Sequence, residues 1–241
     1  MKQIIQIAKR ELSTFFDSLL AYLLVVLFLG FCGFFTWIYG ADVFLQGQAS
    51  LDAFFIVAYW CLFFFIPALT MRAIAGELKS GTLELLLTKP VSDWQVILGK
   101  FFSTFFLILI TLLPTLIYYF TLWGIGPVDH AAVWSGYLGL LLMSSVYISI
   151  GLLCSSFTSN PIIAYLSSLF IGIFFHIIFD VLAANMTGNL GSFFSYLSVS
   201  THFSSISRGV LDSRDLIYFF SLVYLTLFCA KQMISSRSLN A

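Results

Sequence analysis

Apolar residues along the chain fall into six long runs that are separated by short polar stretches. A helix needs about 20 apolar residues to cross a hydrocarbon layer about 30 Å thick, and each run is close to that length. Backbone groups in lipid need internal partners, and barrel strands would alternate over about 10 residues, so the runs predict helices. Their approximate bounds are 19–39, 54–71, 101–123, 133–157, 162–182 and 216–233.

Residues 1–18 have a different period. Their apolar residues recur at intervals of three and four, with basic and polar residues between them: Ile4, Ile5, Ala8, Leu12, Phe15 and Phe16. This pattern predicts an amphipathic helix in the membrane interface, and a frayed polar terminus is the alternative. The run that follows is too long for the apolar core of a cleaved signal peptide.

Composition excludes a single water-soluble core. The 241 residues are 60% hydrophobic and 9% charged, whereas soluble domains carry about 25% charged residues. The net charge of zero argues against a nucleic-acid partner. The four cysteines lie inside apolar runs, so we expect no disulfide framework and no metal site. The fold class is therefore an all-α integral membrane protein with one transmembrane domain, 1–241.

The distribution of basic residues predicts the topology, because cytoplasmic loops are enriched in lysine and arginine. Placing both termini in the cytoplasm leaves only Arg208 and Arg214 outside. Nine of the eleven basic residues then lie inside: Lys2, Lys9, Arg10, Arg72, Lys79, Lys89, Lys100, Lys231 and Arg237.

The longest predicted cytoplasmic segment, 72–100, has its own helical pattern. Gly81 breaks any continuous helix, Thr82 can cap a new one, and Pro90 stops it. Ser92 with Gln95 forms a capping-box pattern for the next helix. This pattern predicts a short helix beneath the membrane, and a solvated turn is the alternative. We expect Arg72 and Lys100 to anchor the neighbouring spans at the level of the lipid headgroups.

These residues resemble the cytoplasmic signature of type-2 ABC exporter permeases. The similarity rests on Met71-Arg72, Glu77, "SGTLELLLT" (80–88), "PVSD" (90–93) and Gly99-Lys100. The six-span layout, the amphipathic start and the late outer segment are also similar, so the likeness covers the whole chain. Within the family, the stretch 198–219 is most similar to the gliding-motility (GldF-like) branch.

The resemblance implies that the short helix is a coupling helix seated in a separate ATPase subunit. It assigns six residues to that interface: Glu77, Gly81, Thr82, Glu84, Leu86 and Pro90. It further implies two ATPase subunits that bind ATP and Mg²⁺, and a second permease chain forming a homo- or heterodimer. The expected location is the bacterial inner membrane, and a periplasmic or membrane auxiliary protein remains a further candidate partner.

No catalytic pattern indicates an enzyme. The only Gly-Lys pair, Gly99-Lys100, has Trp94 where a phosphate-binding loop needs its first glycine and Phe101 where it needs a hydroxyl. Motifs of zinc proteases and serine hydrolases are also missing. We therefore expect a non-catalytic membrane subunit that binds no cofactor itself.

Two features of the predicted outer half carry alternatives. His176 and Asp180 stand one helical turn apart in the fifth span, as either a substrate or proton contact or, preferably, a mutually hydrogen-bonded structural pair. Segment 183–214 fits either a pair of re-entrant half-helices or a surface loop.

Three functions compete at this point. The first is an ABC exporter permease. The second is an ABC-like subunit of a mechanical or assembly machine, as the gliding-motility resemblance suggests. The third is a stand-alone secondary transporter, which is disfavoured because the sequence has no convincing internal repeat.

Overall fold

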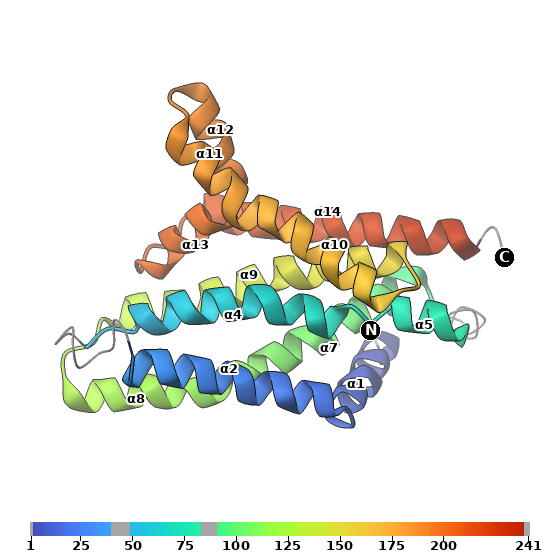
Figure 1. The fold of residues 1–241 in the computed structure, drawn as a ribbon, viewed down its shortest axis with the longest axis horizontal. Coiled ribbons are helices and arrows are strands. Elements are labelled where there is room, and N and C mark those ends of the chain that lie inside the picture. The colour runs from blue at the N-terminus through green and yellow to red at the C-terminus, as the bar shows by residue number, and fades with distance from the viewer. Residues whose placement is uncertain (1, 40–48, 83–90, 239–241) are drawn as a thin grey trace.

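The computed structural model describes residues 2–39, 49–82 and 91–238, and this part of the chain is helical throughout, without strands (Figure 1). The N-terminal half contains α1 (Lys2–Phe16), α2 (Leu19–Trp37), α4 (Asp52–Thr70), α5 (Ala75–Ser80), α7 (Asp93–Leu112), the 3₁₀ turn η1 (Leu113–Thr115) and α8 (Leu116–Ile125). The C-terminal half contains α9 (His130–Phe157), α10 (Pro161–Ile173), the π-helical turn η2 (Phe174–Ile178), α11 (Phe179–Asn185), α12 (Asn189–Leu197), α13 (Val199–Ser207) and α14 (Ser213–Ser238).

The predicted spans correspond to helices of the structure. Five helical segments are long and apolar enough to cross a membrane: 52–80, 93–125, 130–157, 161–185 and 213–236. A sixth candidate is the pair formed by α1 and α2, which is bent by 74° between its two helices. The all-α membrane fold is thus confirmed. The third span begins at Asp93 and not at 101, because Ser92 caps it with the predicted box, in which the Ser92 amide donates to Gln95 Oε1 at 3.0 Å.

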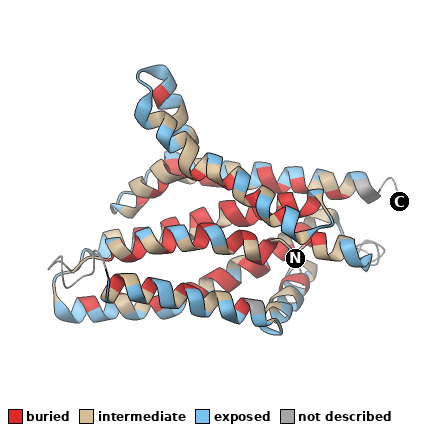
Figure 2. Cartoon of the chain, in the orientation of Figure 1, coloured by how far each residue is buried: buried red, intermediate tan, exposed pale blue. Residues whose placement is uncertain are grey.

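Helix α9 forms the centre of the bundle. It packs against α4, α7, α10, α13 and α14 and is the most buried of the candidate spans (Figure 2). Small residues allow this close packing, since a Cβ at Gly151 would collide with Thr70 and one at Gly136 with Phe55. Helix contacts in lipid depend on such close approach, because the lipid provides no hydrophobic driving force between helices.

Two spans are interrupted within their length. In the third span, η1 contains Pro114, which has no backbone N–H to donate, and the Thr115 hydroxyl donates to the Leu112 carbonyl at 2.6 Å. In the fifth span, η2 widens the helix to π geometry around His176. Proline accounts for the break in the third span, whereas the π turn has no signal in the residue pattern.

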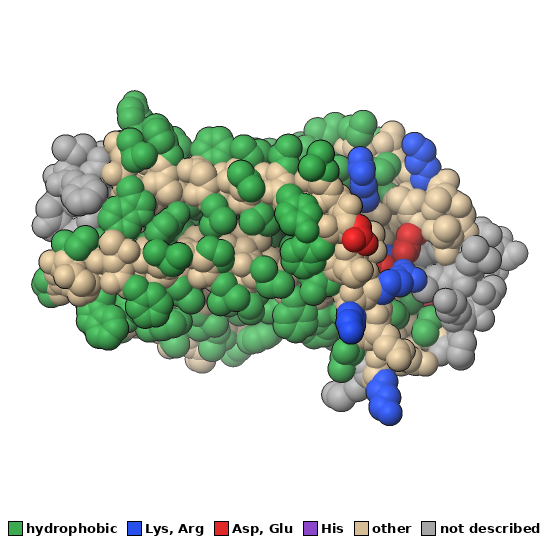
Figure 3. Space-filling view, turned by 90° about the horizontal axis from the view of Figure 1, so that it is seen from below, with side chains coloured by type: hydrophobic (Ala, Val, Ile, Leu, Met, Phe, Trp, Pro, Cys, Tyr) green, Lys and Arg blue, Asp and Glu red, His purple; other side chains and the backbone are tan. Residues whose placement is uncertain are grey.

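The surface separates into an apolar body and a charged end. In the face shown in Figure 3, hydrophobic side chains cover the length of the bundle, while the visible charged side chains gather at one end. That end, called the basic end below, carries α1, α5, the first turns of α7 and the last turns of α14 (Figure 1). The opposite end, called the far end, carries α8, α13 and the first turn of α14.

Segment 183–214 contains two short helices, α12 and α13, and not a plain loop. Helices α11 and α12 project away from the bundle, while α13 packs on α9 (Figure 1). Re-entry of these helices into a bilayer stays a prediction.

Candidate functional site

Helix α5 lies at the basic end, at the close of the candidate span 52–80. It precedes the short helix that the sequence predicts between Thr82 and Pro90, and residues 83–90 of that prediction lie outside the described residues. Helix α5 begins after Ile74 and ends at Gly81, whose φ of 69° is left-handed and favours glycine. The Gly81 amide closes the helix by donating to carbonyls of the preceding turn. Gly81 therefore stops the helix, as the sequence predicts.

Helix α5 receives its N-terminal cap from a distant helix. The Ser155 Oγ atom, on α9, accepts hydrogen bonds from the amides of Ile74 at 3.0 Å and Ala75 at 2.9 Å. The same hydroxyl donates to the Met71 carbonyl at 3.1 Å. These amides have no partner within their own helix, so Ser155 supplies the acceptor that a local capping residue normally provides. The start of α5 is thereby tied to the central helix.

A cluster of four charged residues joins α5 to α1 and α7. Lys100 Nζ lies 2.8 Å from Glu77 Oε1 and 3.4 Å from Glu11 Oε1. Arg10 Nη2 lies 2.7 Å from Glu11 Oε1 and 3.5 Å from Glu77 Oε1. The cluster (Arg10, Glu11, Glu77 and Lys100) therefore has two positive and two negative charges. The hydrogen bond to Glu11 raises the pKa of Arg10, and burial acts in the opposite direction.

The structure corrects the expected role of Lys100. Its side chain is only 1% exposed, so it does not anchor a helix end among lipid headgroups. An ammonium group can be buried at acceptable cost only when it is paired, and the two carboxylates of the cluster provide the pairing. Arg72, in contrast, is exposed.

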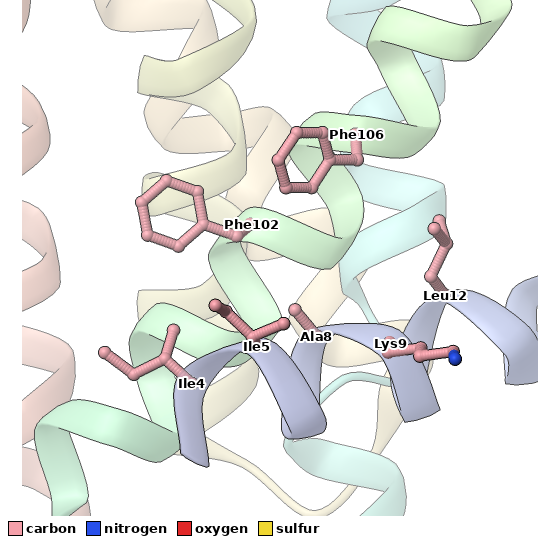
Figure 4. Close-up of a pocket in the computed structure, with 7 residues that line it drawn as sticks. All are labelled: Ile4, Ile5, Ala8, Lys9, Leu12, Phe102 and Phe106. Carbon is pink, nitrogen blue, oxygen red and sulfur yellow. The ribbon is translucent and has the colours of Figure 1, made fainter. Parts of the chain in front are cut away.

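Helix α1 packs across the first turns of α7. Gly99 makes this possible, since a Cβ at that position would come within 2.7 Å of Ile7 side-chain carbons. Beside this contact is a groove of about 560 Å³, lined by Ile4, Ile5, Ala8, Lys9, Leu12, Phe102 and Phe106 (Figure 4). The groove is apolar apart from Lys9, which suits an interfacial helix bordered by lipid chains.

The six residues assigned to an ATPase interface are only partly described. Gly81 and Thr82 are exposed at the end of α5, and the Thr82 hydroxyl lies 2.8 Å from that of Ser80. Glu77 points into the charged cluster, with a side chain that is 18% exposed. Glu84, Leu86 and Pro90 lie outside the described residues. The interface assignment stays a prediction, and Glu77 has an internal partner that the sequence did not indicate.

His176 and Asp180, at the far half of the fifth span, have separate partners. His176 Nδ1 lies 2.6 Å from the hydroxyl of Tyr147, and its ring stacks on Tyr59. Asp180 Oδ1 accepts a weak bond of 3.4 Å from Thr201. These contacts do not support the predicted mutual hydrogen bond. His176 is turned instead toward α4 and α9, which carry Tyr59 and Tyr147.

Sequence reasoning missed a buried pair of a histidine and an aspartate at the far end. His202 Nδ1, on α13, lies 2.6 Å from Asp215 Oδ1, on α14, and His202 Nε2 lies 3.1 Å from the Tyr196 carbonyl. The His202 ring stacks on Tyr218, whose hydroxyl donates to the Leu197 carbonyl at 2.7 Å. An aspartate in the first turn of an apolar span was the available signal, because a carboxylate there needs a partner.

Apolar spans, an amphipathic first helix and a charged end define a multi-pass membrane protein. Residues 41–230 match the model of a family described as ABC-2 family transporter protein. The match covers most of the chain, so the chain belongs to the ABC-2 family, whose members are membrane subunits of ABC transporters. No curated protein matches the chain. Membership in the gliding-motility branch stays a prediction.

Proposed function

We propose that this chain is the permease subunit of a type-2 ABC exporter in a bacterial inner membrane. In this proposal the segment 72–100 is its coupling element, which docks onto a separate ATPase subunit that binds ATP and Mg²⁺. Two ATPase subunits and a second permease chain complete the transporter. Family membership supports the class, and the architecture at the basic end supports the coupling role.

The observation that carries the coupling role is the attachment of α5 to three other helices. Ser155 ties its first turn to α9, and the pairing of Glu77 with Lys100 ties its middle to α7. The pairing of Glu77 with Arg10 adds α1. A helix held at several points by rigid elements transmits a displacement to them as a unit. A push on α5 by an ATPase subunit would therefore reach α1 and the third and fourth spans together.

Charge distribution supports the proposed orientation. The basic end contains the described lysines of α1, α5 and α7 and Lys231 near the end of α14. The far end contains Arg208 and Arg214. Because cytoplasmic loops are enriched in lysine and arginine, this distribution supports a cytoplasmic position for the basic end.

Copurification with an ABC ATPase tests the coupling role. A candidate ABC ATPase from the same genome is coexpressed in cells with the tagged permease. The permease is purified in detergent or nanodiscs, and the recovery of the ATPase and its rate of ATP hydrolysis are measured. We expect Thr82→Arg and Glu84→Lys to lower both, because each places bulk or reversed charge on the docking segment. Arg208→Glu, a charge reversal at the far end, is the control and should change neither.

Sidedness gives a second test. A single cysteine at position 84, in a chain whose four native cysteines are replaced by alanine, should react with an impermeant maleimide only after the cells are opened. Labelling in intact cells would overturn the proposal.

A mechanical or assembly output is a second candidate, favoured by the resemblance of residues 198–219 to the gliding-motility branch. It would use the same coupling element. Reconstituted vesicles separate the two outputs, because an exporter moves a solute or lipid when ATP is added, whereas a mechanical subunit stimulates ATP hydrolysis without flux.

A further inference from the structure

A cavity of about 440 Å³ lies at the far half of the bundle, between α4, the η2–α11 region and α13. Side chains of different chemistry line it, including Asp52, Tyr59, Trp60, His176, Asp180 and Ser200. Pockets that bind small molecules combine an apolar lining with a few placed polar groups, and this cavity has that composition.

Two residues that line the cavity, Tyr59 and His176, each have a buried polar atom without a hydrogen-bond partner among the described residues. His176 is 3% exposed, and its ring is stacked between Tyr59, at 4.1 Å, and Phe63, at 4.4 Å. Nδ1 is directed to Tyr147 on α9, while Nε2 has no hydrogen-bond partner among the described residues. His176 lines the cavity, and Nε2 is the ring nitrogen that is left without a partner. A buried polar atom without a partner is destabilising, and a bound ligand that donated a hydrogen bond to it would remove that cost.

The charged side chains around the cavity determine which ligand charge it favours. Asp52 and Asp180 are exposed carboxylates of its lining, and the lining residues include no lysine or arginine. The aromatic faces of Tyr59 and Trp60 also line it and attract cations through their ring quadrupoles. Carboxylates and aromatic rings both favour a cation over an anion or a neutral group.

We infer that this cavity binds an organic ammonium group carried on an apolar chain. An ammonium N–H donates to Nε2 of His176, with the imidazole proton on Nδ1 donating to the Tyr147 hydroxyl. The carboxylates of Asp52 and Asp180 balance the charge. The apolar chain lies along Ile56 and Val181, which line the cavity and are exposed. That this ligand is transported rests on the proposed function, whereas its binding does not.

Equilibrium binding tests the inference without any ATPase. The purified chain in phosphatidylcholine nanodiscs is dialysed against radiolabelled hexylamine, which is protonated at neutral pH, and empty nanodiscs measure partition into lipid. We expect saturable binding that excess unlabelled hexylamine displaces and that hexanol and hexanoate do not. Binding that all three compounds displace equally, or no saturable binding, would overturn the inference.

Variants locate the site. Asp180→Asn should weaken hexylamine binding roughly two- to fivefold, the range for an exposed charge pair, and His176→Phe should weaken it further. The control is Asp129→Asn, a far-end carboxylate outside the cavity, where asparagine caps a helix equally well. Unchanged binding in Asp180→Asn would overturn the inference, and this exposed isosteric change keeps the test valid if His176→Phe misfolds.

Lipid composition separates two sources of the ammonium group. Nanodiscs that contain phosphatidylethanolamine should reduce hexylamine binding if the ligand is a lipid headgroup, and leave it unchanged if the ligand is a soluble amine. Both outcomes retain the ammonium site. Failure of hexylamine binding would leave the permease proposal intact, and failure of ATPase copurification would leave the binding site intact.

Discussion

The ammonium nitrogen of Lys100 lies 2.8 Å from Oε1 of Glu77, although one residue is on α7 and the other on α5. Lys100 is buried at the start of a membrane span, and Glu11 of α1 lies on its other side at 3.4 Å. Two carboxylates from separate helices thus meet one buried cation. This contact holds the short helix against the spans that it is proposed to move.

Replacing Lys100 tests how much the charged cluster stabilises the fold. Lys100→Met removes the buried cation and leaves Glu11 and Glu77 with Arg10 alone as the cation of the cluster. We expect a loss of about 3 kcal/mol in the free energy of unfolding. This is the lower end of the range for a broken buried pair, because both carboxylates retain some solvent contact. Chemical denaturation in detergent measures it. Lys79→Met, which removes an exposed lysine of α5, is the control. An equal effect of the two substitutions would contradict the prediction.

The Ser155 hydroxyl should matter specifically for α5. Ser155→Ala leaves the amides of Ile74 and Ala75 without their acceptor, and we expect a loss of about 1–2 kcal/mol in stability. Hydrogen exchange should become faster at the amides of residues 74–80 while those of α13 keep their rates. Ser145→Ala is matched, since the Ser145 hydroxyl bonds only within its own helix, to the Leu141 carbonyl. Unchanged hydrogen exchange at residues 74–80 would show that the start of α5 does not depend on the Ser155 hydroxyl.

Helices α4 and α9 are in close contact at Gly151 and Thr70. This contact predicts that a destabilising substitution on one helix can be partly compensated by a substitution on the other. A Cβ at Gly151 collides with the Thr70 side chain, so Gly151→Ala should destabilise the chain by about 1–3 kcal/mol. Thr70→Ala in the same chain should recover part of that loss, which a double-mutant cycle measures as coupling. At Gly124, nothing lies within 4 Å of an added Cβ, so Gly124→Ala should be neutral or stabilising. Simple additivity of the Gly151 and Thr70 substitutions would argue against the contact.

The pairing of His202 with Asp215 should hold α13 on α14. Asp215→Asn removes the negative charge from a bond of 2.6 Å within a buried site, and we expect a loss of about 1.5–3 kcal/mol. Faster hydrogen exchange at residues 199–207, with α1 unaffected, would locate the effect. Asp17→Asn, at an exposed position beyond the end of α1, should leave both measurements unchanged. Identical hydrogen exchange at residues 199–207 in the Asp215→Asn variant and the unsubstituted chain would show that this pair does not hold α13 on α14.

The sequence alone determined the class of fold, the spans and the charged end. An apolar run of about 20 residues has one stable form in lipid, so the helices of 130–157 and 161–185 could be read directly from residue order. Local chemistry also settled Gly81 as a helix stop and Ser92 as a cap, because a left-handed glycine and a capping box involve only neighbouring residues.

Tertiary structure decided which polar residues meet. Lys100 was expected at the lipid headgroups and is buried, because α1 and α5 bring carboxylates to it. His176 was expected to pair with Asp180 and bonds instead to Tyr147 of α9. Each of these contacts joins residues that are far apart in the chain. Their partners depend on which helices pack together, and a periodic apolar pattern carries no information about that choice.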